Sequence, residues 1–581
     1  MKDAKNHLGA ICLLWILAAL VLWPTGRLPE ALGHSTGDMI DHLWGTWWFG
    51  GKLLQGELPL HTSITHLPEG ATLWHVDPVG GLIGLFLRPL GFPLAWNGVL
   101  WIQVGLSITA AYAAAWDWTG DRWSACLAGV LVGLSPFSLG LLYSGLSEYL
   151  GLWAPVGATW LLIRNLDRDP RGRPAQRHGI VLTGLAIGVC GLQALYYAAF
   201  AALLALCLVP GRGAVKRARR VVGIGAVSAV LVLPLAWCVR GTLNAPDAAV
   251  NSATAPGWNY HSLPTNDVLT FLRGGDYYFP DTARFGNPGI AHVNYLGWVA
   301  LLLVGLALWR EWRDRTDTET DHSSSPRDRE ILQVRGLLSP AGLYGLLMLG
   351  PTLCIGKKVL TVGSMPVFLP LAIAYLPGSP FRMVHHPYRM VALALPLLAL
   401  LAAVGARRLP RWGRGVAIIL AVAETLWVSP AHWPIPTTDT STPSIHAKLG
   451  DGTVLDWPPD ASDWNRRYLA WQVDHGLSIP YGVNVFLPDP LREDPLVRRL
   501  LTALDDPQSR ARNRDVPFRG RAVLAASGRR SRLGELGVDH LVLHREALTE
   551  AEWTRARAIL RKALGEPGLQ TEDEEAWTPG Q

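Results

Sequence analysis

The stretch from Gly37 to Trp48, GDMIDHLWGTWW, holds the densest set of side chains that could do chemistry. On a helix, Asp38, Asp41 and His42 fall at i, i+3 and i+4 and therefore share one face. The opposite face is apolar and aromatic: Ile40, Leu43, Trp44, Trp47 and Leu54. This pattern predicts an amphipathic helix at a bilayer interface, with its tryptophans toward lipid. A carboxylate there can act as a general base, so we expect Asp38 or Asp41 to be catalytic and His42 to bind substrate.

Three further side chains could complete such a site. His75 and Asp77 occur together in GATLWHVDP, beside Trp74, and predict a sugar-contacting or metal-binding cluster. Glu148, in YSGLSEYLGLW, is predicted at the outer mouth between two spans, where an ionisable group is costly unless it serves a cavity. The competing interpretation is that these polar groups only face water or satisfy structural contacts.

A third group lies later, in LPGSPFRMVHHPYRM, and its members are Arg382, His385, His386 and Arg389. These donors precede a late apolar run and could bind a phosphate or pyrophosphate through charge-assisted hydrogen bonds. Snorkelling of the basic side chains to lipid headgroups is the alternative.

Composition favours a membrane protein, because 49% of the 581 residues are hydrophobic and only 17% are charged. Apolar runs close to the roughly 20 residues that a spanning helix needs recur through the first three quarters of the chain. The first run, 8–23, has no cleavage site behind it and is interpreted as a retained anchor. The net charge is +6, and the basic residues gather in short connections between the apolar runs. This distribution is typical of residues that orient a membrane protein, and it argues against a nucleic-acid partner.

These runs predict about eleven transmembrane helices, with the N-terminus cytoplasmic and every large basic cluster inside. The segment 78–93, rich in proline and glycine, is predicted to be re-entrant or interfacial, because a span there would invert all later loops. The residues 1–430 then form the transmembrane part, with large outer loops at 24–96 and 241–292.

The hydrophilic tail, 431–581, is predicted to be a small extracytoplasmic α/β domain. GTVLDW and DHLVLH are typical of strands and DWNRRYLAWQVDHG of a helix, while Thr549 and Glu552 have capping-box spacing. The predicted fold is therefore mostly α, a polytopic helical membrane protein with a small α/β C-terminal domain. Motifs of nucleotide-binding enzymes and proteases are absent from the sequence.

The pattern resembles the GT-C superfamily of integral-membrane glycosyltransferases, and more closely its YfhO-like branch of bacterial membrane proteins. The resemblance covers most of the chain as architecture. It rests on the acidic motif after the first span and on short phrases elsewhere: LLQGELPL, LPEGATLW, FRMVHHPYRM, VLDWPP, YLAWQVDHG and LGVDHLVLH. GTWWFG lacks the acidic residue of the oligosaccharyltransferase WWD motif, which argues against that subgroup.

The resemblance implies inverting transfer of a hexosyl or pentosyl group from a polyprenyl-phosphate-linked donor to a glycan, lipid or protein acceptor. It assigns the base to Asp38 or Asp41 and donor-phosphate contacts to Arg382 and Arg389. It also implies the bacterial cytoplasmic membrane and a role at the cell envelope. A divalent cation, Mg²⁺ or Mn²⁺, is left open, because no clear second acidic pair follows in the next loop. The alternatives are a non-catalytic protein of the same fold and a lipid or solute transporter.

Overall fold

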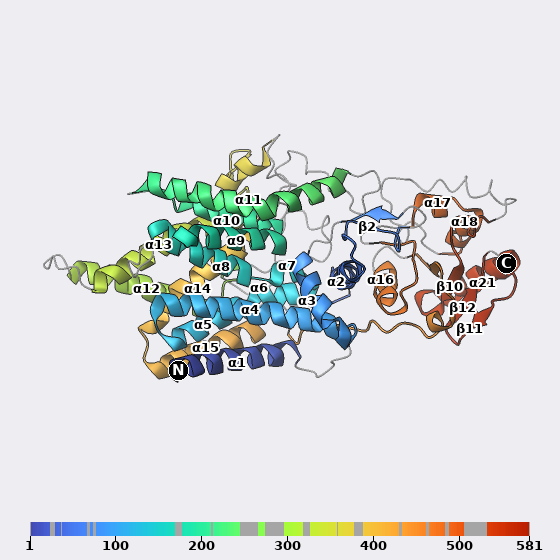
Figure 1. The fold of residues 1–581 in the computed structure, drawn as a ribbon, viewed down its shortest axis with the longest axis horizontal. Coiled ribbons are helices and arrows are strands. Elements are labelled where there is room, and N and C mark those ends of the chain that lie inside the picture. Colours follow the sequence, from blue (N-terminus) through green and yellow to red (C-terminus); the bar gives the residue numbers. More distant parts are fainter. Residues whose placement is uncertain are drawn as a thin grey trace.

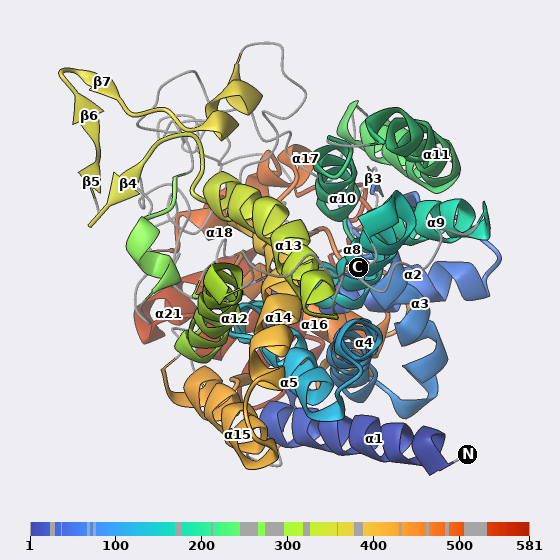
Figure 2. The same cartoon turned by 90° about the vertical axis from the view of Figure 1, so that its left-hand side faces the viewer.

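The computed structural model describes the whole chain except residues 1, 24–29, 36–37, 67–69, 74–76, 169–176, 211–212, 245–264, 273–294, 318–325, 357, 377–386, 429–432, 460–463, 483–486, 505–530 and 580–581. Long helices run side by side along the long axis and form a bundle (Figures 1 and 2). They are α1 (Lys2–Leu22), α4 (Leu94–Thr119), α5 (Arg122–Gly133), α6 (Pro136–Ser144), α8 (Trp153–Ile163), α9 (Arg177–Gln193), α10 (Leu195–Cys207), α11 (Ala214–Asn244), α12 (Trp298–Asp317), α13 (Pro326–Met348), α14 (Val391–Arg407) and α15 (Arg411–Trp427). Helix α14 is buried along most of its length and contacts α4, α5, α8, α12 and α13, so it forms the centre of the bundle.

Among the described residues, four helical segments are long and apolar enough to cross a membrane: Lys5–Leu22, Leu94–Thr119, Arg122–Ser144 and Ala214–Gly241. Further apolar helices are shorter. Large apolar side chains such as Leu13, Leu20 and Trp237 point outward from the bundle, as lipid-facing residues do. The count of eleven spans stays a prediction.

Several of the basic connections predicted to be cytoplasmic lie together at one end of the bundle. Arg414 Nη1 is 2.5 Å from Asp121 Oδ1, which joins the start of α15 to the turn between α4 and α5. Arg220 Nη1 donates to the Asn165 carbonyl over 2.9 Å, which joins α11 to the end of α8. The amino end of α1 lies at this end too, and the C-terminus lies at the opposite end (Figure 1).

The segment predicted not to cross the membrane forms helix α3 (Pro78–Leu87), followed by a 3₁₀ turn over Arg88–Leu90. A ten-residue helix is about 15 Å long, half the thickness of a bilayer core. Helix α3 packs its glycines toward α2 and α4, whereas Leu82 and Phe86 on its other side are exposed.

Helix α2 (Met39–Leu54) lies across the end of the bundle, since it is seen end-on in Figure 1 and side-on in Figure 2. The prediction that its tryptophan face contacts lipid is wrong for Trp44. Trp44 is 1% exposed and donates through Nε1 to Gln472 Oε1 over 2.7 Å, and its ring stacks on Trp48. Helix α16 (Trp464–His475) covers this face, so protein and not bilayer buries the aromatic side of α2.

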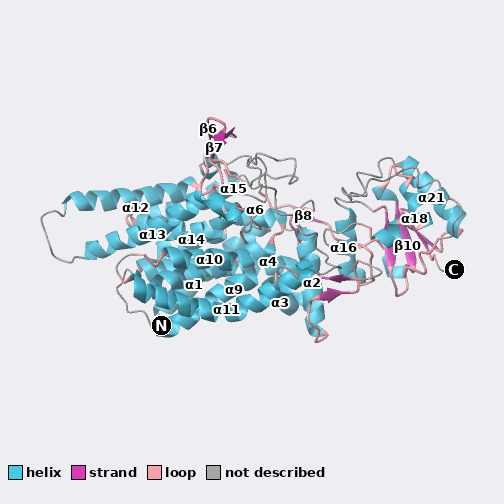
Figure 3. Cartoon of the chain, turned by 90° about the horizontal axis from the view of Figure 1, so that it is seen from above, coloured by secondary structure: helices cyan, strands magenta, loops and turns pink. Residues whose placement is uncertain are grey.

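The C-terminal part holds a four-stranded sheet, which stands at the end of the molecule farthest from the bundle (Figure 3). Its strand order is β11 (Leu569–Gln570), β12 (Glu574–Trp577), β10 (His540–His544) and β9 (Val454–Trp457), with β9 and β10 parallel and the other pairs antiparallel. Around it lie α17 (Asp489–Arg492), α18 (Pro495–Leu501) and α21 (Glu550–Leu564). The predicted strands β9 and β10 and the Thr549–Glu552 capping box are confirmed.

The loops contain short antiparallel strand pairs: β2 (His61–Thr62) with β3 (Ala71–Thr72), β4 (Cys354–Ile355) with β5 (Lys358–Val359), and β6 (Thr361–Val362) with β7 (Met365–Pro366). One pair bridges distant parts of the chain. Strand β1 (Ala31–Leu32), which follows the first helix, pairs antiparallel with β8 (Thr437–Thr438), which follows the last helix of the bundle. This pairing brings the segment after α1 and the C-terminal part to the same end of the bundle.

Candidate active site

Helix α2, which contains the acidic motif, packs against the turn between α6 and the short helix α7 (Ser147–Leu150). That turn contains Gly145, whose φ of +67° is left-handed. A Cβ at Gly145 would lie 2.4 Å from the Met39 Cβ, so only glycine lets α2 approach this closely. The approach places Asp41 and His42 opposite Glu148.

The two aspartates of the motif occupy different environments. Asp38 is exposed at the amino end of α2, whereas Asp41 is buried one turn later. Arg466 of α16 contacts both, with Nη2 3.3 Å from Asp38 Oδ1 and 3.8 Å from Asp41 Oδ2. Neither carboxylate oxygen of Asp41 has a hydrogen-bond partner among the described residues. A buried carboxylate without hydrogen-bond partners is uncommon unless it serves a ligand or a reaction.

His42 and Glu148 form the second part of the cluster. His42 Nδ1 lies 3.3 Å from Glu148 Oε2, and both side chains are 7% exposed. Within the described part of the chain, neither of these two atoms has a hydrogen-bond partner. The backbone of Glu148 is held in place, because its carbonyl accepts from Gln193 Nε2 at the end of α9 over 3.0 Å.

The two carboxylate oxygens of Asp77 have different surroundings. Asp77 caps α3, since its Oδ1 accepts from the Gly80 N–H over 2.6 Å. Its other oxygen, Oδ2, is buried and has no hydrogen-bond partner in the described structure. The capping role is a structural one that the sequence interpretation did not include. His75, predicted to act with Asp77, lies outside the described residues.

Arg389 brings a cation to the same region from the amino end of α14. Its Nη1 donates to the Tyr149 hydroxyl, and its guanidinium stands over the Tyr149 ring, 4.0 Å from the centroid. Tyr149 directly follows Glu148, and the charge of Arg389 acts on both His42 and Glu148. Arg382, His385 and His386, predicted to act with it, lie outside the described residues.

Burial controls the protonation of these groups, which lie outside the candidate spans. It raises the pKa of Asp41 to about 6, while the neighbouring Arg466 charge opposes the increase. Burial likewise raises the pKa of Asp77 to about 6 and that of Glu148 to about 8, with Arg389 opposing the latter. The pKa of His42 is lowered by burial. At neutral pH, Asp41 is therefore largely ionised, Glu148 largely protonated and His42 neutral.

A divalent cation was left open by the sequence, and the described side chains do not assemble a site for it here. Oxygen ligands suit Mg²⁺ or Mn²⁺, and Asp41, Asp77 and Glu148 supply them. However, among the described residues these carboxylates and His42 do not form a cluster of three close ligand atoms.

Arg466 is the site residue that sequence reasoning missed. It belongs to a predicted helix, but it lies 428 positions from Asp38, and its type and spacing give no signal of that contact. Tyr149 was missed in the same way, although it adjoins Glu148. Of the predicted residues, the structure brings together Asp38, Asp41, His42, Asp77, Glu148 and Arg389 at the end of the bundle nearest the C-terminal part.

Comparison with known proteins gives distant structural likenesses. No family model matches the chain, and no curated protein sequence matches it. The fold is similar to the archaeal oligosaccharyltransferase AglB from Archaeoglobus fulgidus, at 12% identity and a TM-score of 0.43, over 97% of this chain and 72% of that one. It is similar to ArnT from Cupriavidus metallidurans, at 13% identity and a TM-score of 0.42, over 98% and 97%.

A third likeness is to the arabinofuranosyltransferase AftD from Mycobacteria, at 14% identity and a TM-score of 0.46, over 93% of this chain and 36% of that one. At these levels of similarity, the activities of the three proteins do not carry over to this chain.

Proposed function

We propose that this chain is an integral-membrane glycosyltransferase of the GT-C type, which transfers a sugar from a polyprenyl-phosphate-linked donor to an extracytoplasmic acceptor. The observation that carries the proposal is the Asp41 carboxylate. Both its oxygens are buried without hydrogen-bond partners among the described residues, and burial brings its pKa to about 6. A base of that pKa is largely ionised at neutral pH and can still accept a proton.

Asp41 is the general base in this proposal. It takes the proton of the acceptor hydroxyl or amine while the acceptor atom forms a bond to the anomeric carbon of the donor sugar. The bond between that carbon and the phosphate oxygen breaks, and polyprenyl phosphate leaves with the electron pair. The attack comes from the face opposite the leaving group, so the anomeric configuration inverts. Asp38, which is exposed and ion-paired, helps to hold Arg466 in position.

Arg389 contacts the leaving phosphate. Its guanidinium is fixed by the Tyr149 hydroxyl and ring, and a fixed cation stabilises negative charge that develops in the transition state. Glu148, protonated at neutral pH, donates a hydrogen bond to the donor sugar or phosphate, and neutral His42 contacts the acceptor. Arg382, His385 and His386, eight or fewer positions before Arg389 in the sequence, are proposed to bind the same phosphate.

The proposed location is the bacterial cytoplasmic membrane. With a cytoplasmic N-terminus, the end of the bundle that carries α2 and the C-terminal part faces outward, where acceptors for the cell envelope are found. This orientation is supported by the basic connections that gather at the opposite end.

The test compares cells that carry the wild-type protein, Asp41→Asn, or Asp474→Asn, an exposed aspartate of α16, at matched membrane levels. We expect Asp41→Asn to remove one surface glycan or glycolipid and to accumulate its lipid-linked donor, as a deletion does, while Asp474→Asn changes neither. If deletion alters a glycoconjugate and Asp41→Asn does not, Asp41 is not the base. If deletion of the protein changes no glycoconjugate, the protein is not a glycosyltransferase in those cells.

A further inference from the structure

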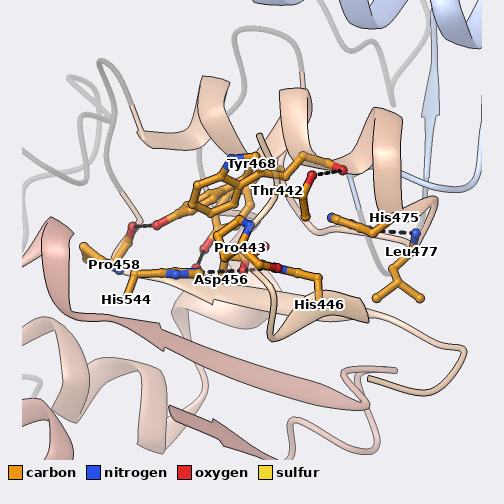
Figure 4. A network of polar contacts seen from close by, with 11 residues as sticks. Thr442, Pro443, His446, Asp456, Pro458, Tyr468, His475, Leu477 and His544 are labelled. Carbon is orange, nitrogen blue, oxygen red and sulfur yellow. Dashed lines mark hydrogen bonds and ion pairs between the residues drawn. The ribbon is translucent and has the colours of Figure 1, made fainter. Parts of the chain in front are cut away.

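A second cluster of ligand-type side chains lies in the C-terminal part, away from Asp41. His446, Asp456 and His544 come from three elements: the 3₁₀ turn His446–Lys448, β9 and β10. His446 Nε2 is 2.9 Å and His544 Nε2 is 2.8 Å from the same oxygen, Asp456 Oδ1 (Figure 4). All three residues are buried, and their ligand atoms lie within 4.8 Å of one another.

The hydrogen-bond pattern of this cluster can accommodate a cation. The other ring nitrogen of His446, Nδ1, lies 3.4 Å from the Pro443 carbonyl, which can only accept. A neutral imidazole has one N–H, so an Nδ1–H that donates to Pro443 leaves a lone pair on Nε2 facing the Asp456 carboxylate. That lone pair repels the oxygen unless a proton or a metal ion lies between them. A metal-ligating histidine commonly donates its second nitrogen to a backbone carbonyl in this way.

The second oxygen of Asp456 supports a ligand more directly. Asp456 is 0% exposed, and its Oδ2 has no hydrogen-bond partner among the described residues. A fully buried carboxylate oxygen with no partner is costly. A metal ion held by Asp456 and the two imidazoles would neutralise that charge.

The cluster also has an entry path. His544 lines a cleft of about 500 Å³ whose wall includes Glu546, Asp573 and Glu574. With Asp439 the lining has four carboxylates against one guanidinium, that of Arg467, and this net negative charge attracts a cation. The aromatic rings of Tyr468 and Trp471 pack on His544 and hold its imidazole in one orientation.

We propose that His446, Asp456 and His544 bind a divalent zinc ion. Two imidazole nitrogens and one carboxylate are ligands that zinc accepts, and a tetrahedral ion keeps one further position, which a water from the cleft can fill. The ion ties the turn after β8 to the two parallel strands β9 and β10. This inference does not depend on the proposed glycosyl transfer, because the Asp41 cluster contributes no ligand.

The test uses the full-length protein, purified in detergent, stripped with a chelator and incubated with Zn²⁺ alone. We expect about one zinc ion per chain, measured by elemental analysis after removal of free metal. Co²⁺ in place of zinc should give the visible absorption of a tetrahedral site with nitrogen and oxygen ligands. The wild-type spectrum needs no variant, so it tests the proposal even if a substitution prevents folding.

His446→Ala and His544→Ala should each weaken zinc binding by roughly tenfold or more. The matched control is His540→Gln, a histidine of the same strand β10 that lies outside the cluster. Zinc binding that is unchanged in both alanine variants would overturn the proposal, and so would a folded wild-type protein that takes up no zinc and gives no cobalt spectrum. In that case a shared proton, and not a metal, joins the two imidazoles to Asp456.

Discussion

His42 Nδ1 lies 3.3 Å from Glu148 Oε2, which joins helix α2 to the short helix α7 between α6 and α8. Since burial lowers the pKa of His42 and raises that of Glu148, both groups are neutral near pH 7. Asp41 and Asp77, each with a pKa of about 6, are the buried carboxylates of the site that are ionised at that pH. This contrast with the neutral Glu148 predicts that the proposed sugar transfer depends on pH.

We predict a bell-shaped pH dependence of sugar transfer. The rate should rise as pH increases through about 6, where Asp41 ionises, and fall above about 8, where Glu148 loses its proton. Turnover of the lipid-linked donor in isolated membranes measures this profile. Glu148→Gln should remove the alkaline limb and keep the acidic one. An unchanged alkaline limb in this variant would mean that Glu148 is not the group that titrates there.

Stability should depend on pH through Glu148 as well. Its pKa in the folded state is raised from 4.5 to about 8, so the contribution of the proton is fully present below pH 4.5 and is lost as pH rises through about 8. The loss is at most about 5 kcal/mol. Thermal unfolding of the purified protein between pH 5 and 9 measures it, and Glu148→Gln should flatten the curve. Glu57→Gln, an exposed glutamate, is the control and should leave the curve unchanged.

Arg466 should determine the pH at which activity rises on the acidic side of the pH profile. Its charge lowers the pKa of Asp41, so Arg466→Gln should shift the rise in activity to higher pH, and Arg466→Lys should restore part of the shift. The exposed Arg532 provides a control, because Arg532→Gln should leave the profile in place. A loss of rate without any shift in the profile would contradict an electrostatic role for Arg466.

The contact between α2 and α16 should be visible in stability. Trp44→Phe removes the donor to Gln472 Oε1 and leaves that buried acceptor unsatisfied, at a cost of about 1–3 kcal/mol. Unfolding of the purified protein in detergent measures the change. Trp123→Phe, at a half-exposed tryptophan of α5, should change stability by less than about 0.5 kcal/mol. Equal effects of the two substitutions would show that the Trp44 contact contributes little.

Gly145 should tolerate no side chain. Gly145→Ala forces an L residue into a left-handed conformation and against Met39, which should destabilise the protein by about 2–4 kcal/mol. Gly157→Ala is the matched control. It lies inside α8, where a Cβ meets nothing within 4 Å, so alanine should be neutral or stabilise by up to about 1 kcal/mol. The same unfolding measurement compares both variants.

Local signals in the sequence predicted much of this structure. The helix over the acidic motif, strands β9 and β10 and the capping box of α21 all follow from periodicity and capping residues within a few positions. The environment of α2 did not follow. Its apolar face suits lipid and protein equally, and the group that decides between them, Gln472, is 428 positions away from Trp44.

The candidate site, too, was predicted in part from local signals and missed where distant segments meet. The sequence placed Asp41, His42 and Glu148 near one another, because each borders an apolar run on the same predicted side of the membrane. It could not separate Asp38 from Asp41, since burial by α16 makes that difference. It also missed the cluster of His446, Asp456 and His544, whose members are 10 and 88 positions apart and meet only when β9 and β10 pair in parallel.

The pairing of β1 with β8 joins two distant parts of the chain. The strand after the first bundle helix forms its hydrogen bonds with the strand after the last bundle helix. In a chain of this order the acidic site is completed only after the last helix of the bundle has been synthesised. Helix α2 leaves the ribosome early, yet the α16 side chains that cover Trp44 and pair with Asp38 arrive after the last bundle helix. The surroundings of Asp41 are therefore complete only once α16 has been made and has packed on α2.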